Sequence, residues 1–206
     1  MEEKKLSLGE SVAGLDKAQL FSVGALFLLG VLSIFSAGAG FEGRGAGFAT
    51  RQLLWGAVSI AAFLLTLKIG YEKFLREAYL LYGLSLVLLL SVMALGLTVK
   101  GSQRWIDLGF FRLQPTEFVK ITLVLVLAKH LCRYPPLNFL SFLGGLAVPA
   151  LSGILVLIQP DAGSAIVYGV ISFVAIVVAG APWRYPAGLL AIFTSLLPFG
   201  WRFLRE

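Results

Sequence analysis

The chain has 206 residues, of which 58% are hydrophobic, and its 17 Lys and Arg residues against 11 Asp and Glu residues give a net charge of +6. The hydrophobic residues stand in repeated blocks long enough to cross a bilayer of roughly 30 Å, which excludes an ordinary soluble domain. The basic residues are spread through the short segments between these blocks, so the charge indicates membrane orientation and not a nucleic-acid-binding surface.

Taken in chain order, the apolar blocks predict an all-α polytopic membrane protein with about seven transmembrane helices. Helices are expected instead of barrel strands because the blocks are continuous and do not alternate. A modest excess of Lys and Arg in alternate segments predicts a cytoplasmic N-terminus. No long linker divides the sequence, so residues 1–206 are expected to form a single transmembrane domain. The predicted spans are 20–37, 52–67, 79–97, 115–131, 139–158, 162–180 and 186–201.

The fourth predicted span begins with Gln114-Pro-Thr-Glu117 and carries Lys120 one turn later. Proline is favoured at a first helical position, so Pro115 indicates a helix start. Counting the spans from a cytoplasmic N-terminus places this start on the outer face. Glu117 and Lys120 are three residues apart and share a helix face, where they are expected to pair toward the bundle or a water-filled cavity. The alternatives are that Glu117 is a helix-start carboxylate stabilised by the helix dipole, and that Lys120 extends its side chain toward the membrane surface.

The sixth span is preceded by a similar pattern, Gln159-Pro160-Asp161, and Pro160 is again expected at the helix start. The fourth and sixth helices should both begin on the outer side, which places Asp161 on the same side of the membrane as Glu117.

The loop before the fourth span adds Arg104, Trp105 and Asp107 to that outer surface. Arginine suits bidentate contact with phosphate, tryptophan suits the headgroup level, and helix N-termini supply N–H groups that bind anions. These residues predict a site for an anionic headgroup. The alternative is an interfacial anchor with a local ion pair between Arg104 and Asp107.

The single cysteine and the single histidine do not indicate a catalytic or metal site at the inner side of the membrane. Cys132 and His130 are each the only residue of their type, so a zinc site made of Cys and His is nearly excluded, and no protein metal site is predicted. Both lie between Lys129 and Arg133 at a predicted inner helix end, where interaction with the helix dipole is favoured over catalysis.

Several of these motifs together resemble the SEDS family of shape, elongation, division and sporulation proteins. The residues that carry the resemblance are Gly101-Ser-Gln-Arg-Trp-Ile-Asp-Leu-Gly109, Phe111-Arg-Leu-Gln-Pro-Thr-Glu117, Lys120 and Gln159-Pro-Asp-Ala-Gly-Ser164. Within the family, 103–109 is more similar to the rod-shape branch than to the division branch. Ala162 and Ser164 depart from the more common Leu and Thr.

The resemblance implies a peptidoglycan glycosyltransferase of the bacterial inner membrane that polymerises lipid II beside a class B penicillin-binding protein. It implies catalytic roles for Glu117, Lys120 and Asp161, and substrate contacts for Arg104, Trp105, Asp107, Gln114 and Gln159. A divalent cation, Mg²⁺ or Mn²⁺, could bridge a carboxylate and a pyrophosphate. The resemblance also implies about ten transmembrane helices for a family member. The chain is therefore expected to be an N-terminal part that ends before an outer loop carrying a further acid.

Two other functions remain open from the sequence. A transporter of lipid-linked precursors would use a similar charged cavity, and a noncatalytic scaffold would present its helices to a synthase partner. Transport predicts polar residues at mid-membrane depth in several helices, whereas these charges lie near one face.

Overall fold

The computed structural model describes residues 14–39, 45–95, 97–99, 102–109 and 111–203. It divides into two compact units, Met1–Lys73 and Phe74–Glu206, and each is described by itself. The predicted single domain for 1–206 stays a prediction.

The first unit is a pair of long helices, α2 (Lys17–Ala39) and α3 (Gly45–Ile69). Asp16 begins α2, because its carboxylate accepts a hydrogen bond from the Ala18 N–H at 2.7 Å. The helices approach closely where α2 ends and α3 begins: a Cβ atom added to Gly38 would lie 2.7 Å from the Gly45 Cα. Small residues permit such contacts between membrane helices. A short helix, α4 (Tyr71–Arg76), follows.

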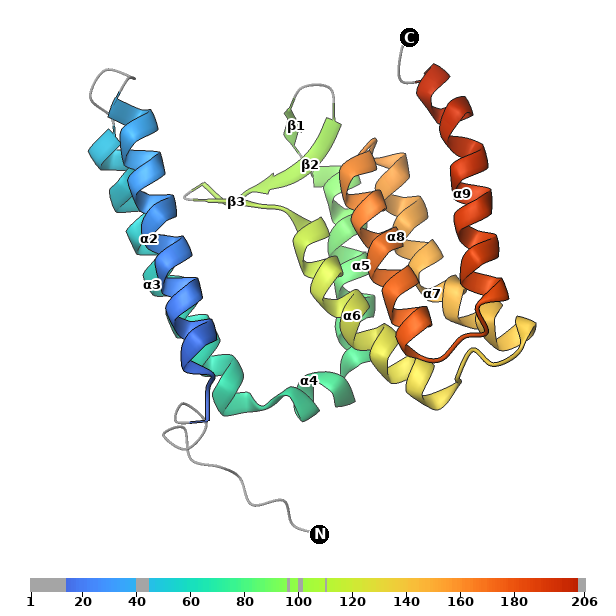
Figure 1. Ribbon diagram of the computed structural model, residues 1–206. Helices are drawn as coiled ribbons and strands as arrows, with labels where there is room; N and C mark the ends of the chain where they lie inside the picture. The colour runs from blue at the N-terminus through green and yellow to red at the C-terminus, as the bar shows by residue number, and fades with distance from the viewer. Residues whose placement is uncertain (1–13, 40–44, 96, 100–101, 110, 204–206) are drawn as a thin grey trace. The chain divides into compact units, whose positions relative to one another are not determined.

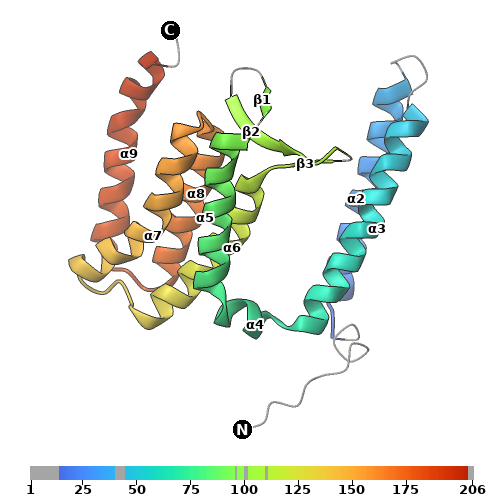
Figure 2. The same cartoon turned by 180° about the vertical axis from the view of Figure 1, so that it is seen from behind.

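The second unit contains five longer helices and a small sheet (Figure 1). The helices are α5 (Ala78–Leu95), α6 (Pro115–Arg133), α7 (Phe139–Ile158), α8 (Ala162–Val178) and α9 (Arg184–Phe203). Seen from either side, α5 to α8 stand side by side in a bundle, and α9 follows α8 (Figures 1 and 2). Tyr185 of α9 stacks on Phe142 of α7 with ring centroids 4.9 Å apart, which attaches the first turn of α9 to the bundle.

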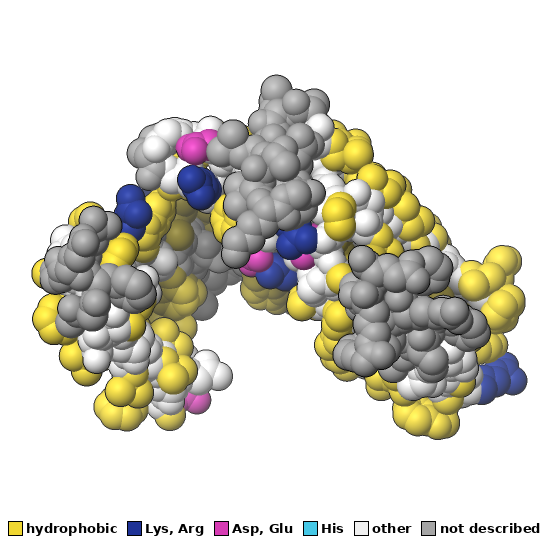
Figure 3. Space-filling view, turned by 90° about the horizontal axis from the view of Figure 1, so that it is seen from above, with side chains coloured by type: hydrophobic (Ala, Val, Ile, Leu, Met, Phe, Trp, Pro, Cys, Tyr) yellow, Lys and Arg dark blue, Asp and Glu magenta, His cyan; other side chains and the backbone are white. Residues whose placement is uncertain are grey.

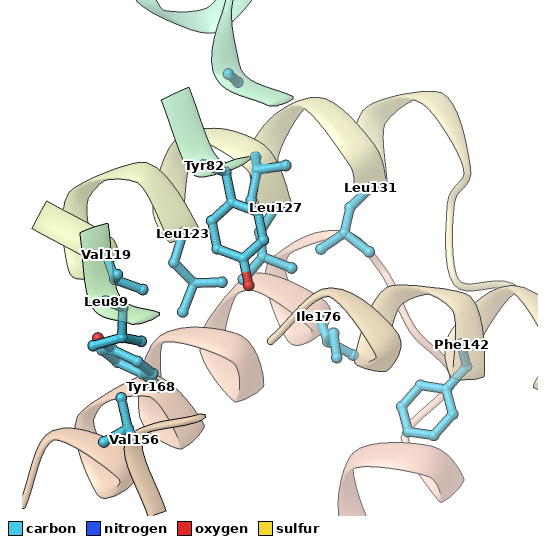
Figure 4. Packing of buried hydrophobic residues seen from close by; sticks show 12 residues of the cluster. Tyr82, Leu89, Val119, Leu123, Leu127, Leu131, Phe142, Val156, Tyr168 and Ile176 are labelled. Atoms are coloured by element: carbon cyan, nitrogen blue, oxygen red, sulfur yellow. The ribbon is translucent and has the colours of Figure 1, made fainter. Parts of the chain in front are cut away.

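The core of this unit lies between α5, α6, α7 and α8. Leu89, Val119, Val156 and Tyr168 come from these four helices and lie together, and each is at most 1% exposed (Figure 4). The Tyr82 hydroxyl also donates a hydrogen bond to the Val148 carbonyl oxygen at 2.7 Å, joining α5 to α7. The bundle is therefore held by apolar packing supplemented by buried hydroxyl groups, as membrane helices commonly are.

The seven predicted spans correspond to seven long helices of the described residues, which confirms the all-α class. Three of these helices, α2, α3 and α7, are long and apolar enough to cross a membrane by length and composition, and α5 and α8 contain shorter apolar segments. The charged residues at both ends of α6 make it less apolar.

A three-stranded antiparallel sheet was not predicted. Its strands are β1 (Leu97–Val99), β2 (Ser102–Asp107) and β3 (Arg112–Leu113), in the order β1-β2-β3, and they connect α5 to α6. Asp107 Oδ1 accepts a hydrogen bond from the Gly109 N–H at 2.8 Å, and Gly109 has φ +83°, a conformation that glycine permits. This turn brings β3 back along β2. We call this end of the bundle the sheet end, and the end where α6 and α8 finish the opposite end.

Candidate functional site

Arg104 and Asp161 meet at the sheet end of the bundle. Arg104 lies on β2 and Asp161 immediately precedes α8, and their side chains form an ion pair with Nη1 and Oδ1 3.7 Å apart. Arg104 Nη2 also donates a hydrogen bond to the Pro160 carbonyl oxygen. The structure therefore brings together two predicted site residues that are 57 positions apart in the sequence.

Asp161 is the N-cap of α8, which corrects the predicted place of Pro160. Its Oδ1 accepts from the Ser164 N–H at 3.3 Å, and its Oδ2 accepts from the Ser164 hydroxyl at 2.7 Å. α8 begins at Ala162, so Pro160 lies in the turn after α7 and not at a first helical position. The prediction was wrong because an aspartate that caps the helix needs a place before its first residue. The prediction that Pro115 begins α6 is confirmed.

Gln159 ends α7 beside this ion pair and is buried. Its Nε2 donates a hydrogen bond to the Leu89 carbonyl oxygen of α5 at 2.8 Å. Within the described residues, Gln159 Oε1, Arg104 Nε and Thr116 Oγ1 are buried side-chain atoms without a hydrogen-bond partner. Buried polar atoms are usually satisfied, so these three atoms are exceptions at the sheet end.

Glu117 and Lys120 form the predicted pair on α6, with Oε1 and Nζ 2.6 Å apart. The Glu117 side chain is 56% exposed and the Lys120 side chain 27%. The pair therefore lies at the surface of the described structure and is only partly turned toward the bundle. Acidic and basic side chains adjoin one another near the middle of the face seen from this end (Figure 3).

Tyr168 joins α8 to the first turn of α6, and the sequence analysis did not select it. Its hydroxyl donates a hydrogen bond to the Thr116 carbonyl oxygen at 3.0 Å, next to Glu117 in the first turn of α6. Tyr168 is 1% exposed. Its position seven residues after Asp161, two turns along one helix face, was a signal that could have indicated it.

Three other predicted residues lie apart from these contacts. Trp105 is half-buried on β2 and follows Arg104, so the two side chains point to opposite faces of the strand. Asp107 is exposed and pairs with Arg112 Nε at 3.8 Å. Gln114 occupies the N-cap of α6 without a capping hydrogen bond from its side chain.

The local Arg104–Asp107 pair, considered as the alternative for this loop, does not form. Arg104 pairs with Asp161, and Asp107 pairs with Arg112. Successive side chains of a β-strand point to opposite faces, so residues 104 and 107 lie on different faces of β2. This explains why their side chains have different partners.

The described residues do not fit a divalent cation by themselves. They contain no group of three or more His, Cys, Asp or Glu side chains that could hold a metal ion. Asp161, the carboxylate considered for such a role, is already engaged by Arg104 and Ser164. Mg²⁺ binding usually requires oxygen ligands from one or two carboxylates in addition to substrate phosphates.

The family comparison agrees with this architecture. A model for the FtsW/RodA/SpoVE family, described as "Cell cycle protein", matches residues 17–204. The chain belongs to this family. The motifs around Arg104, Glu117 and Asp161 had predicted this. It is an all-α, multi-pass membrane protein.

Two curated relatives carry glycosyltransferase names. The chain is 33% identical to the probable peptidoglycan glycosyltransferase FtsW of Halorhodospira halophila, over 96% of this chain and 53% of the relative. It is 29% identical to the peptidoglycan glycosyltransferase MrdB of Escherichia coli K12, over 93% of this chain and 51% of the relative. The chain thus spans about half the length of these relatives.

Solved structures show the same arrangement of helices. The chain resembles the rod shape determining protein RodA of Thermus thermophilus with a TM-score of 0.74 and 30% identity, covering 89% of this chain and 59% of that one. It also resembles a chain of a peptidoglycan synthase complex described for its coordination of polymerization and crosslinking. That TM-score is 0.77 at 30% identity, covering 90% of this chain and 55% of the other.

Proposed function

We propose that this chain supplies the membrane bundle of a peptidoglycan glycosyltransferase that polymerises lipid II at the outer face of a bacterial inner membrane. The proposal includes a class B penicillin-binding protein as partner. The observation that carries it is the Arg104–Asp161 pair, which holds a guanidinium at the start of α8. Guanidinium groups and helix N-termini both bind phosphate. The glycosyltransferase names of the relatives and the synthase complex support the same reading.

The proposed reaction joins two lipid-linked sugars. A sugar hydroxyl oxygen attacks the anomeric carbon of the second sugar, a new glycosidic C–O bond forms, and the bond from that carbon to the pyrophosphate oxygen breaks. Undecaprenyl pyrophosphate leaves with the bonding electrons, and the hydroxyl proton passes to a base. The step requires proton acceptance and stabilisation of the departing pyrophosphate.

The residues of the sheet end suit these tasks in different ways. Arg104 is positioned by Asp161 to contact the pyrophosphate, while its Nε is free of protein partners among the described contacts. Glu117 is exposed enough to meet a substrate, and its carboxylate pairs with Lys120 at 2.6 Å. Gln159 and Gln114 lie at the ends of α7 and α6 as further polar groups. A divalent cation would require ligands from substrate or from residues beyond this set.

The distribution of charge favours glycosyl transfer over transport. Among the described helices α5 to α8, the charged side chains belong to α6 alone, and they occupy its first two turns and its last two turns. A precursor headgroup crossing the membrane would need polar contacts along the intervening depth.

The decisive experiment measures polymerisation of labelled lipid II with a class B penicillin-binding protein present. The purified 206-residue chain is compared with a version extended through the outer loop that the family resemblance implies. In whichever version makes glycan, Glu117→Ala should lower the rate about 100-fold, because a positioned acid or base contributes at least that factor. Glu77→Ala is the matched control, since this exposed acid pairs with Arg76 at the opposite end.

A second substitution tests the phosphate contact. Arg104→Ala should lower kcat/KM for lipid II about 10- to 100-fold, the effect of a lost charge-assisted contact of about 1.5–3 kcal/mol. Arg112→Ala, which removes an exposed guanidinium from the neighbouring strand, should change it little. Unchanged polymerisation by both Glu117→Ala and Arg104→Ala at normal membrane level would overturn the catalytic reading and favour the scaffold.

A further inference from the structure

A groove lies between α6 and α8 toward the opposite end of the bundle, away from the candidate site. Its volume is about 690 Å³, and apolar side chains line it, including Val124 and Leu131 of α6 and Val170 and Val174 of α8. Leu131 is 4% exposed and forms part of its floor, whereas Val174 is 52% exposed. The groove is therefore open on one side among the described residues.

The length of the groove matches one leaflet. From Val170 of α8 to its C-cap Ala179 the wall covers nine residue steps, or about 13.5 Å at 1.5 Å per residue. Half of a roughly 30 Å hydrocarbon core is about 15 Å, whereas a transmembrane helix would need a groove about twice as long. Toward the sheet end the lining stops at Val124 and Val170, and beyond it the Tyr168 hydroxyl donates a hydrogen bond to the Thr116 carbonyl oxygen, which joins α8 to α6. These dimensions favour a lipid chain over a protein helix.

A cation neighbours the groove in the chain. Cys132 and Pro135 line the groove, and Arg133 lies between them in the chain. The Arg133 guanidinium lies over the Tyr134 ring, 5.5 Å from its centroid, and no carboxylate pairs with it among the described residues. Lys129, by contrast, is turned toward α5, where it donates to the Arg76 carbonyl oxygen and lies over the Tyr79 ring.

The surroundings of the mouth are suited to the headgroup region. At this end of the second unit, Glu77 is the one described acid, and Arg76 pairs with it at 3.2 Å. Lys129, Arg133 and Arg184 leave an excess of positive charge. Tyr134 is 50% exposed and Trp183 68% exposed, as expected for aromatic residues at a membrane interface.

We propose that this groove binds an acyl chain of an anionic phospholipid whose phosphate contacts Arg133. Apolar walls of one leaflet's length accommodate the chain, and the unpaired cation selects the headgroup. The excess of basic residues places this end at the cytoplasmic leaflet, where anionic lipids create a negative surface potential. The site is separate from the proposed catalytic end and does not depend on its activity.

Cys132 provides a direct test, because it is the only cysteine of the sequence, is exposed and lines the groove. The full chain carrying a small fluorophore on Cys132 is placed in phosphatidylcholine bilayers containing increasing fractions of a lipid with brominated chains. Brominated phosphatidylglycerol should reach half-maximal quenching at about a fivefold lower mole fraction than brominated phosphatidylcholine, the effect expected of one Lys or Arg near the surface.

Two variants separate the headgroup contact from the chain contact. Arg133→Gln should abolish the preference for phosphatidylglycerol, while Arg184→Gln, which removes another cation at the same end, should retain it. Val174→Trp fills the groove and should reduce quenching by both lipids at least twofold. Ile154→Trp, at a 57% exposed position of α7 outside the groove, should not.

The results also distinguish an anionic lipid from other occupants of the groove. Equal quenching by the two lipids in the unmodified chain would overturn the anionic site, as would a preference that survives Arg133→Gln. Quenching unaffected by Val174→Trp would overturn the groove as the place of binding. If a longer family chain shields Cys132 from both brominated lipids, a polypeptide occupies the groove and the proposal is wrong.

Discussion

Two ion pairs at the same end of the bundle differ in how the protein holds them. Arg104 and Asp161 are joined across β2 and α8, and the Asp161 side chain is 8% exposed. Glu117 and Lys120 are neighbours on one helix, and the Glu117 side chain is 56% exposed. The first pair therefore joins elements that are distant in the sequence, whereas the second joins neighbours on one helix and leaves the carboxylate exposed. Stability measurements should separate the two before any activity is measured.

The largest loss of stability is expected for Asp161→Ala. This change removes the N-cap of α8 and leaves Arg104 partly buried without its partner. Lost caps cost about 1 kcal/mol and broken buried pairs about 3–5 kcal/mol, so a total near 3 kcal/mol is expected for a pair whose arginine is one-third exposed. The free energy of unfolding in detergent micelles, measured by steric trapping, provides the check.

Asp161→Asn is the matched control for that change, because asparagine caps a helix as well as aspartate does but carries no charge. It should recover about 1 kcal/mol relative to Asp161→Ala. If alanine at this position leaves the unfolding free energy unchanged, Asp161 does not join the elements and the comparison between the pairs fails.

A smaller loss is expected for Tyr168→Phe, which keeps the ring in the core and removes the hydrogen bond to the Thr116 carbonyl oxygen. The expected cost is about 1 kcal/mol. Tyr134→Phe serves as its control, since that tyrosine is half exposed at the opposite end. Equal effects of the two substitutions on unfolding would show that Tyr168 does not hold α8 to α6 through this bond.

The smallest loss is expected for Glu117→Ala, at about 0.5 kcal/mol or less, because exposed pairs three or four residues apart on a helix contribute little. Added salt should reduce even this difference, since exposed charges are screened. A cost above about 2 kcal/mol would show that Glu117 is a structural group. The predicted loss of polymerisation would then need no chemical explanation.

The sheet and the Tyr168 contact show where prediction from sequence stopped. β2 has a Trp and an Ile among polar residues but only six residues in all, too few for a strong alternating pattern. Tyr168 lies in an apolar segment that is long enough to be explained as a membrane helix, so the sequence offered little reason to select this residue. Both features depend on partners that are distant in the sequence.

The sequence was sufficient to predict the membrane class, the seven long helices of the described residues and the Glu117–Lys120 pair. Hydrocarbon satisfies no backbone polar groups, so long apolar blocks leave the helix as the available form, and residues three apart on a helix adjoin each other wherever it lies. The folded structure was needed to learn that Arg104 pairs with Asp161 and not with Asp107, and that Pro160 precedes α8. Those outcomes depend on which face of β2 meets the turn between α7 and α8, a relation set by the packing of the whole bundle.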